Sequence, residues 1–158
     1  MPIIHADQFK SFLKPGAKLL GLDMSKNAIG IAFADCDTGI VTPVTVINRK
    51  RLKDDAEKLA KLMDQYGTKS VIVGWPLNMD GSEGKRCQAV KDTVLEFQKS
   101  MQAVKFVFWD ERLSTAQAYK LVEEIGAKSI KNKGKPVDNH AAMVILRSFL
   151  DELLPRTA

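Results

Sequence analysis

The chain has 158 residues, of which 45% are hydrophobic and 27% are charged, and its formal net charge is +5. These values favour a single globular domain and exclude a disordered, collagen-like or coiled-coil chain. No apolar run is long enough to cross a bilayer, and MPIIHADQF lacks the basic and apolar regions of a signal peptide. We therefore expect a cytoplasmic protein that does not contact membranes. The basic excess is compatible with a polyanionic partner without establishing one.

The first half of the chain predicts one short helix followed by three strands. Apolar residues on one face predict a helix over residues 7–13. The segment 18–24 (KLLGLDM) is apolar on both faces, which is typical of a central strand covered on two sides. Further strands are predicted over 29–34 and 41–47. Pro43 indicates that the last of these lies at an edge of the sheet, because proline cannot donate a ladder hydrogen bond.

The second half alternates between helical and extended periodicity. Apolar residues at helical spacing predict helices over residues 52–66, 85–101, 114–124 and 138–154. Short apolar runs predict strands over residues 70–74 and 104–109. The breaker-rich segment 75–84 and the lysine-rich segment 127–137 predict loops. Three strands followed by alternating helices and strands predict an α/β fold with a mixed sheet and helices on both faces.

Four acidic residues occupy positions that are unusual for surface charges. Asp23 lies near the end of an apolar strand, where it either binds a cation or forms the following turn. Asp110 and Glu111 follow another hydrophobic strand, and since strand side chains alternate, at most one of them shares a face with Asp23. The other is expected to pair with Arg112 or to cap the next helix. Asp138 heads the apolar face of the last predicted helix, where helix capping is the simpler alternative.

These acids are compatible with a metal site. In α/β sheets, ligands collect at the carboxyl ends of the strands. Three carboxylates without a nearby histidine or cysteine suit a hard divalent cation such as Mg²⁺ or Mn²⁺. Two such ions can stabilise the attacking and leaving oxygens of a phosphodiester.

Basic residues gather in two segments, where they can bind phosphates. The first lies at the start of a predicted helix, where positive charge opposes the helix dipole, although a solvated surface is the simpler explanation. It comprises Arg49, Lys50, Arg51 and Lys53. The second is the loop before Asp138, and it contributes Lys128, Lys131, Lys133 and Lys135.

Four segments resemble the YqgF family, also called RuvX or pre-16S rRNA nucleases, which is related to Holliday junction resolvases. They are GLDMSKNAIGIA (21–32), VGWPLNMDGSEG (73–84), WDERLSTAQA (109–118) and NKGKPVDNHAAMVIL (132–146). The resemblance covers nearly the whole chain past residue 17, in the family's order and spacing. The second and third motifs are highly specific in combination.

The resemblance implies an RNase H-like fold, in which a five-stranded mixed sheet is flanked by helices on both faces. Residues 1–158 would form one nuclease domain with a short helical extension over residues 1–16. The family's acidic positions correspond to Asp23, Asp110, Glu111 and Asp138, the same acids singled out above. We expect Asp23, Glu111 and Asp138 to bind Mg²⁺ or Mn²⁺. Glu111 is favoured over Asp110 because its side chain reaches further.

Two positions depart from the family pattern. Ser25 stands where the family usually has glycine, two residues after the first acid. Glycine would allow a positive φ or a close approach to phosphate, whereas serine offers a hydroxyl to metal or phosphate. Ala28 replaces the basic residue usual in the turn before Ile-Gly. Both changes leave room for a protein that binds RNA with little catalysis.

The resemblance therefore predicts a metal-dependent endonuclease that acts on structured nucleic acid, in 5′-end maturation of pre-16S rRNA. The alternatives are a Holliday junction resolvase acting on branched DNA and a weakly catalytic or non-catalytic ribosome-assembly factor. The expected partners are nucleic acid and, through it, the ribosome, and the protein is expected to be a monomer or homodimer. The residues expected to bind substrate are Ser25, Lys26, Asn78, Arg112, Lys131, Lys133 and Lys135.

Overall fold

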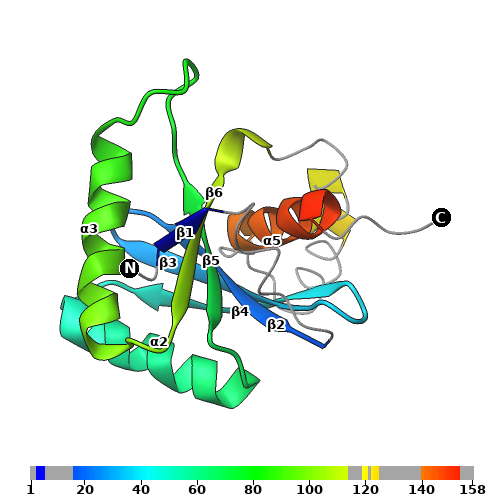
Figure 1. Cartoon of the computed structure of the whole chain (residues 1–158), viewed down its shortest axis with the longest axis horizontal. Helices are drawn as coiled ribbons and strands as arrows, with labels where there is room; N and C mark the ends of the chain where they lie inside the picture. The colour runs from blue at the N-terminus through cyan, green and yellow to red at the C-terminus, as the bar shows by residue number, and fades with distance from the viewer. Residues whose placement is uncertain (1–2, 6–15, 114–118, 121, 125–139, 154–158) are drawn as a thin grey trace.

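In the computed structural model the described residues are 3–5, 16–113, 119–120, 122–124 and 140–153 (Figure 1). They form a mixed six-stranded sheet with the strand order β1-β6-β5-β2-β3-β4. The strands are β1 (Ile3–His5), β2 (Lys18–Met24), β3 (Ala28–Asp35), β4 (Ile40–Asn48), β5 (Ser70–Trp75) and β6 (Lys105–Asp110). The five strands predicted from the sequence are all present, and the mixed α/β architecture is confirmed.

The sheet combines an antiparallel meander with parallel strands. β2, β3 and β4 pair antiparallel in chain order, whereas β5 pairs in parallel with β2 and β6. β4 is an edge strand, as Pro43 predicts, and it contains a bulge at Val44, because Ile31 pairs with Thr45 and Ala32 with Pro43. Since β2, β5 and β6 run parallel, their carboxyl ends meet at one edge of the sheet.

β1 differs from the expectation for the N-terminus. The sequence predicts a helical extension over residues 1–16, but Ile3–His5 pair in parallel with residues 106–108 of β6 and add a sixth strand to the predicted five. Three residues carry too little periodicity to be recognised, and their ladder partner is distant in the chain. The helix predicted over residues 7–13 lies outside the described residues.

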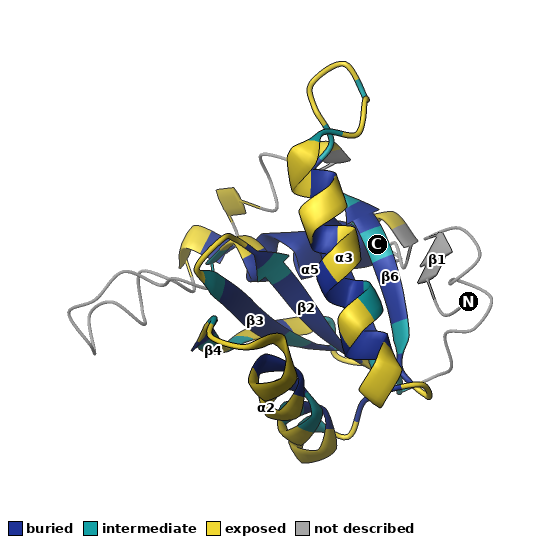
Figure 2. Ribbon diagram, turned by 90° about the vertical axis from the view of Figure 1, so that its left-hand side faces the viewer, coloured by how far each residue is buried: buried dark blue, intermediate teal, exposed yellow. Residues whose placement is uncertain are grey.

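Helices cover both faces of the sheet (Figures 1 and 2). α2 (Leu52–Tyr66) and α3 (Lys85–Ser100) lie on one face, and α5 (His140–Leu153) lies on the other. α2 coincides with its predicted range and ends at Gly67, whose left-handed φ of 65° closes the last turn. Residues 119–120 and 122–124, within another predicted helix, are also helical. None of the described helices is long and apolar enough to span a bilayer.

Alternating side chains of the sheet fill a separate core on each face. On the α5 face Leu19, Ile72 and Val107 are fully buried. On the face covered by α2 and α3, Leu20 and Phe97 are equally inaccessible. Because strand side chains alternate, this pattern also fixes the face on which each residue at a strand end lies.

The contact between β2 and α5 depends on Gly21. A Cβ at this position would lie 2.5 Å from Leu146 Cγ and 3.1 Å from the carbonyl oxygen of Ala142. The substitution Gly21→Ala therefore forces α5 away from the sheet. We expect it to lower the free energy of unfolding by about 1–3 kcal/mol, measured by urea denaturation.

The double variant Gly21→Ala/Leu146→Ala serves as the control. If the clash with Leu146 is the cause, the double variant loses less stability than the two single variants together. Strictly additive losses would contradict this account of the helix–sheet contact.

Candidate functional site

Two carboxylates meet at the edge formed by the carboxyl ends of the parallel strands. Asp23 is the penultimate residue of β2, and its position in the alternation places it on the α5 face. Glu111 follows β6 directly and opens a short 3-10 helix, η2 (Glu111–Leu113). A Cβ on Gly74 of β5 would lie 2.5 Å from Glu111 Oε1 and 2.6 Å from Ile145 Cδ1 of α5. Glu111 therefore lies over β5, the strand next to β2, on the same face as Asp23.

The two carboxylates are partly buried and repel each other. Burial raises the pKa of Asp23, and the Arg86 guanidinium offsets part of this effect. Burial also raises the pKa of Glu111, and the negative charge of Asp23 raises it further, while Arg86 again acts in the opposite sense. Neither carboxylate has an ion-pair partner among the residues that the structure describes. Like charges held out of water in this way are costly unless a cation binds them.

Asp110 lies on the opposite face and binds Arg112. Its Oδ1 accepts hydrogen bonds from the backbone N–H and from Nε of Arg112, at 2.9 and 3.1 Å. Nη2 of Arg112 donates to Oδ2 at 2.8 Å. Burial alone would raise the pKa of Asp110, but these hydrogen bonds and the charge of Arg112 lower it. The expectation that one of the two adjacent acids pairs with Arg112 is confirmed, and that acid is Asp110.

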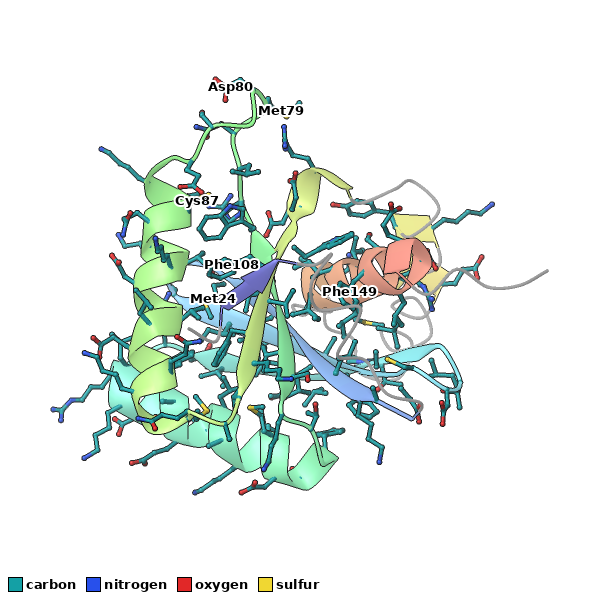
Figure 3. The ribbon with its side chains drawn as sticks, in the orientation of Figure 1. Met24, Met79, Asp80, Cys87, Phe108 and Phe149 are labelled. Atoms are coloured by element: carbon teal, nitrogen blue, oxygen red, sulfur yellow. The ribbon has the colours of Figure 1, made fainter. Side chains whose placement is uncertain are left out.

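The loop between β5 and α3 projects beyond the end of the sheet, with Asp80 at its tip (Figure 3). Asn78 donates from its backbone N–H to Ser82 O at 2.9 Å and from Nδ2 to Ser82 Oγ at 3.0 Å. Gly81 has a φ of 87°, and a Cβ there would lie 3.4 Å from Nη1 of Arg112. The side chain of Asn78 is thus engaged within the loop, and Arg112 connects the loop to β6.

The turn between β2 and β3 accommodates Ser25 in place of glycine. Ser25 Oγ donates to Ala28 O at 3.0 Å and accepts from the Ala28 N–H at 3.1 Å. Nη1 of Arg49 donates to Ser25 O at 2.9 Å. Over the described ranges only glycines have a positive φ, so serine causes no backbone strain here. The hydroxyl therefore closes the turn that directly follows Asp23.

Arg86 is a residue that sequence reasoning did not single out. It lies in the first turn of α3, and its charge lowers the pKa of both Asp23 and Glu111. A signal was present in the sequence, because the first turn of α3 contains Lys85 and Arg86 but no acid, which opposes the helix dipole. By contrast, the first turn of α2 contains two acidic residues, which offset the basic run before it.

Several predicted site residues lie outside the described part of the chain. They are Asp138, Lys131, Lys133 and Lys135. Within the described part, no three Asp, Glu, His or Cys side chains are grouped closely enough to hold a metal ion. Asp23 and Glu111 are thus two members of the predicted acidic set, and α5, which is described from His140 onward, lies on their face of the sheet.

The arrangement of the sheet and helices is similar to that of solved resolvases. The RuvC protein of Thermus thermophilus in complex with a Holliday junction substrate has a TM-score of 0.57 at 11% identity, over 88% of this chain and 97% of that chain. The Fowlpox virus resolvase in complex with Holliday junction DNA has a TM-score of 0.54 at 12% identity, over 87% and 99%. This likeness defines the fold, which is RNase H-like, as the sequence resemblance implies.

The family follows from the sequence itself. Residues 17–152 match the family described as "RuvX: Holliday junction resolvase". A "Putative pre-16S rRNA nuclease" from Bartonella tribocorum is 36% identical over 153 residues, which cover 97% of each chain. A protein of the same name from Ruegeria pomeroyi is 37% identical over 147 residues, or 93% of this chain and 94% of its own. The chain therefore belongs to the RuvX family.

The substitution Asp23→Asn is expected to raise the stability of the metal-free protein. Because the pKa of Asp23 is higher in the folded than in the unfolded state, its ionisation costs folding free energy above the folded pKa and none below the unfolded pKa. The advantage of the variant should be largest near neutral pH and vanish as the pH falls through the folded pKa. We expect a gain of order 1 kcal/mol, or about 2–4 °C in Tm, in thermal melting with EDTA.

Asp92→Asn is the matched control, because it removes the same charge from an exposed position of α3. The Asp92 carboxylate accepts a hydrogen bond from Gln88 at 2.8 Å, which the amide oxygen of asparagine can still accept. Its Tm should stay close to that of the wild type. Equal stabilisation by both variants, or a less stable Asp23→Asn protein at neutral pH, would contradict the electrostatic account.

Proposed function

We propose that this chain is a divalent-metal-dependent endonuclease whose metal is held by Asp23, Glu111 and Asp138. The observation that carries the proposal is the pair of partly buried carboxylates on one face, Asp23 and Glu111. Burial raises the pKa of both carboxylates, and neither has an ion-pair partner among the described residues. Carboxylate oxygens without thiol or imidazole groups fit Mg²⁺ or Mn²⁺. When bound, such an ion supplies Lewis-acid assistance to phosphodiester hydrolysis.

The start of α5 supports Asp138 as the third ligand. The first turn of α5 lies over β2, since the carbonyl oxygen of Ala142 is 3.1 Å from where a Cβ of Gly21 would stand. Gly21 precedes Asp23 by two residues and therefore lies on the same face of β2. A residue just before α5 can reach the same edge of the sheet, which favours Asp138 for this role.

Basic residues around the carboxylates would orient the substrate. Arg86 places a positive charge beside both carboxylates, where it can hold the phosphate that is cut. Nε and Nη2 of Arg112 donate to Asp110, and Nη1, which donates to no residue that the structure describes, can bind a phosphate. The proposed substrate-binding set is completed by Ser25, Lys26, Asn78, Lys131, Lys133 and Lys135.

We propose the 5′ end of pre-16S rRNA as the substrate, because relatives that match nearly the full chain are named "Putative pre-16S rRNA nuclease". The family description and the fold shared with junction-bound resolvases favour four-way junction DNA as the second candidate. An rRNA substrate would place the protein in the cytoplasm, in contact with the ribosome or its precursors.

The purified protein is expected to cut an RNA fragment that spans the mature 5′ end of 16S rRNA with Mn²⁺ or Mg²⁺, and not with EDTA. Asp23→Asn and Asp138→Asn should each lower the rate about a hundred-fold, since each removes one charged ligand. The measurement is gel analysis of end-labelled pre-rRNA, four-way junction DNA and unstructured single strands under the same conditions.

Each result of that assay selects one function. Cutting that persists in EDTA, or in both variants, rules out the metal-carboxylate mechanism. Preferential cutting of the four-way junction selects the resolvase. Tight, salt-sensitive RNA binding without cutting at any divalent ion concentration selects the assembly factor.

The adjacent acids Asp110 and Glu111 allow a matched comparison. Glu111→Gln should abolish cutting and also the rise in Tm that Mn²⁺ produces in the wild type, because the lost charge lies on the face of Asp23. Asp110→Asn should keep the Mn²⁺-dependent rise, although loss of the 2.8 Å ion pair with Arg112 lowers the Tm slightly. The reverse pattern in thermal melting would assign the metal to Asp110.

A further inference from the structure

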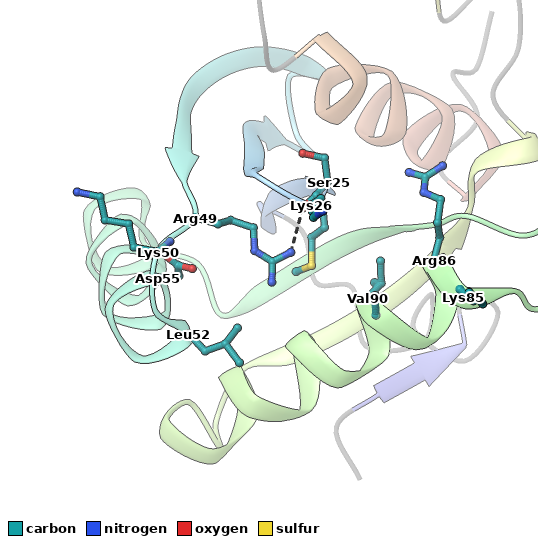
Figure 4. A pocket seen from close by; sticks show the side chains of 11 residues that line it. Ser25, Lys26, Arg49, Lys50, Leu52, Asp55, Lys85, Arg86 and Val90 are labelled. Carbon is teal, nitrogen blue, oxygen red and sulfur yellow. Dashed lines mark hydrogen bonds between the residues drawn. The ribbon is translucent and has the colours of Figure 1, made fainter.

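We propose that a cationic pocket near the carboxylates binds phosphates of the nucleic-acid strand that is cut. The pocket has a volume of about 600 Å³ and lies between the β2–β3 turn, the start of α2 and the start of α3 (Figure 4). Its cationic lining consists of Lys26, Arg49, Lys50, Lys85 and Arg86. This inference rests on the proposed nuclease function and extends it from the scissile bond to the flanking backbone.

Described acids offset only part of the positive charge of the pocket. None of its five cationic side chains forms an ion pair with a described acid. The single acid in the lining, Asp55, is 1% exposed, and its Oδ1 accepts a hydrogen bond from the Lys50 N–H at 3.3 Å. Cations confined around one cavity raise the local concentration of anions, and phosphate oxygens are acceptors for all of them.

Arg49 is fixed in the wall of the pocket before any ligand binds. Its Nη1 donates to Ser25 O at 2.9 Å, and its Nη2 donates to Thr93 Oγ1 at 3.0 Å. Thr93 is itself buried and donates to Ala89 O at 3.0 Å. Both groups that accept from Arg49 are neutral, so neither offsets its positive charge. A rigid cation of this kind lowers the entropy lost on binding.

The two helices that border the pocket begin there without side-chain caps. The side chain of Arg51, the N-cap of α2, forms no capping hydrogen bond, and Gly84, the N-cap of α3, has no side chain that could form one. The first turn of α3 also carries Lys85 and Arg86 against the helix dipole. A phosphate at this position would accept from first-turn N–H groups and offset the unfavourable charge of the turn.

The pocket and the pair of carboxylates lie at the same end of β2, on opposite faces of the sheet. Met24 and Ser25, which belong to its lining, directly follow Asp23 in the chain. Arg86 lines the pocket and also interacts electrostatically with Asp23 and Glu111. A strand whose scissile phosphate lies at the carboxylates and that continues past the end of β2 would therefore place a neighbouring phosphate in the pocket.

Charge reversal at the exposed residues Lys50 and Lys85 tests this inference. At about 100 mM salt with EDTA, Lys50→Glu/Lys85→Glu should bind the pre-16S rRNA fragment at least about ten-fold more weakly in fluorescence anisotropy. The slope of log Kd against log salt should fall by about 1–2, since each lost phosphate contact removes about 0.7–0.9. The matched control Lys18→Glu/Lys69→Glu reverses the charge of two exposed lysines. They lie at the amino ends of β2 and β5, whereas the pocket lies at the carboxyl end of β2. This control should change Kd by less than about two-fold.

Thermal melting separates a damaged fold from a lost contact. Both double variants should keep the Mn²⁺-dependent rise in Tm of the wild type, because the carboxylates are untouched. The milder Lys50→Gln/Lys85→Gln variant should weaken RNA binding in the same direction by a smaller factor. Equal weakening by the control lysines would attribute binding to the overall field of the protein and overturn the pocket.

The remaining outcomes distinguish this inference from the nuclease proposal. Unchanged RNA binding by Lys50→Glu/Lys85→Glu, with cutting by the wild type, overturns the pocket and leaves the nuclease. If the wild type binds RNA but does not cut it, and Lys50→Glu/Lys85→Glu loses this binding, the result supports the pocket and overturns the nuclease proposal. If inorganic phosphate raises the Tm of the wild type but not of the variant, while both bind RNA equally, the pocket binds a free anion and the inference fails.

Discussion

The absence of side chains at Gly21 and Gly74 governs how closely α5 approaches the sheet. A Cβ at Gly21 would lie 2.5 Å from Leu146 Cγ, and one at Gly74 would lie 2.6 Å from Ile145 Cδ1. The space at Gly74 also admits the carboxylate of Glu111, whose Oε1 would be 2.5 Å from that Cβ. One steric constraint in two adjacent strands thus brings together α5, the carboxyl ends of the strands and the candidate site.

Close approach of the helix has an electrostatic consequence. Burial is the largest cause of the raised pKa of Asp23 and also of Glu111, and for Glu111 the negative charge of Asp23 adds to it. Arg86 offsets only part of this effect, because the pKa of each carboxylate remains raised. The folded protein therefore keeps two acids where neutral side chains would be more stable. Such a loss of stability at one edge of a sheet is typical of a site retained for its chemistry.

Strong local periodicity made the centre of the fold predictable. β2 and α2 coincide with their predicted ranges, because an apolar strand and an amphipathic helix carry their signals in contiguous residues. Alternation along the strand predicted that only one of Asp110 and Glu111 lies on the face of Asp23. The sequence favoured Glu111 because its side chain is longer. In the structure the reason is its position, since Glu111 lies over β5 on the face of Asp23. β1 and the position of Arg86 could not be predicted, because both depend on contacts between segments distant in the chain.

Ser25 connects the acidic and the cationic parts of the site. Its hydroxyl closes the turn after Asp23, and its carbonyl accepts from Arg49, whose other nitrogen reaches Thr93 of α3. The strand end that carries the carboxylate is therefore tied to the helix that carries Arg86. Ser25 does not have a positive φ, because among the described residues only glycines do. The turn therefore does not use the conformational freedom that glycine would supply at this position. Serine at this position therefore closes the turn after Asp23 without backbone strain, and the departure from the family pattern does not disturb the strand end that carries this carboxylate.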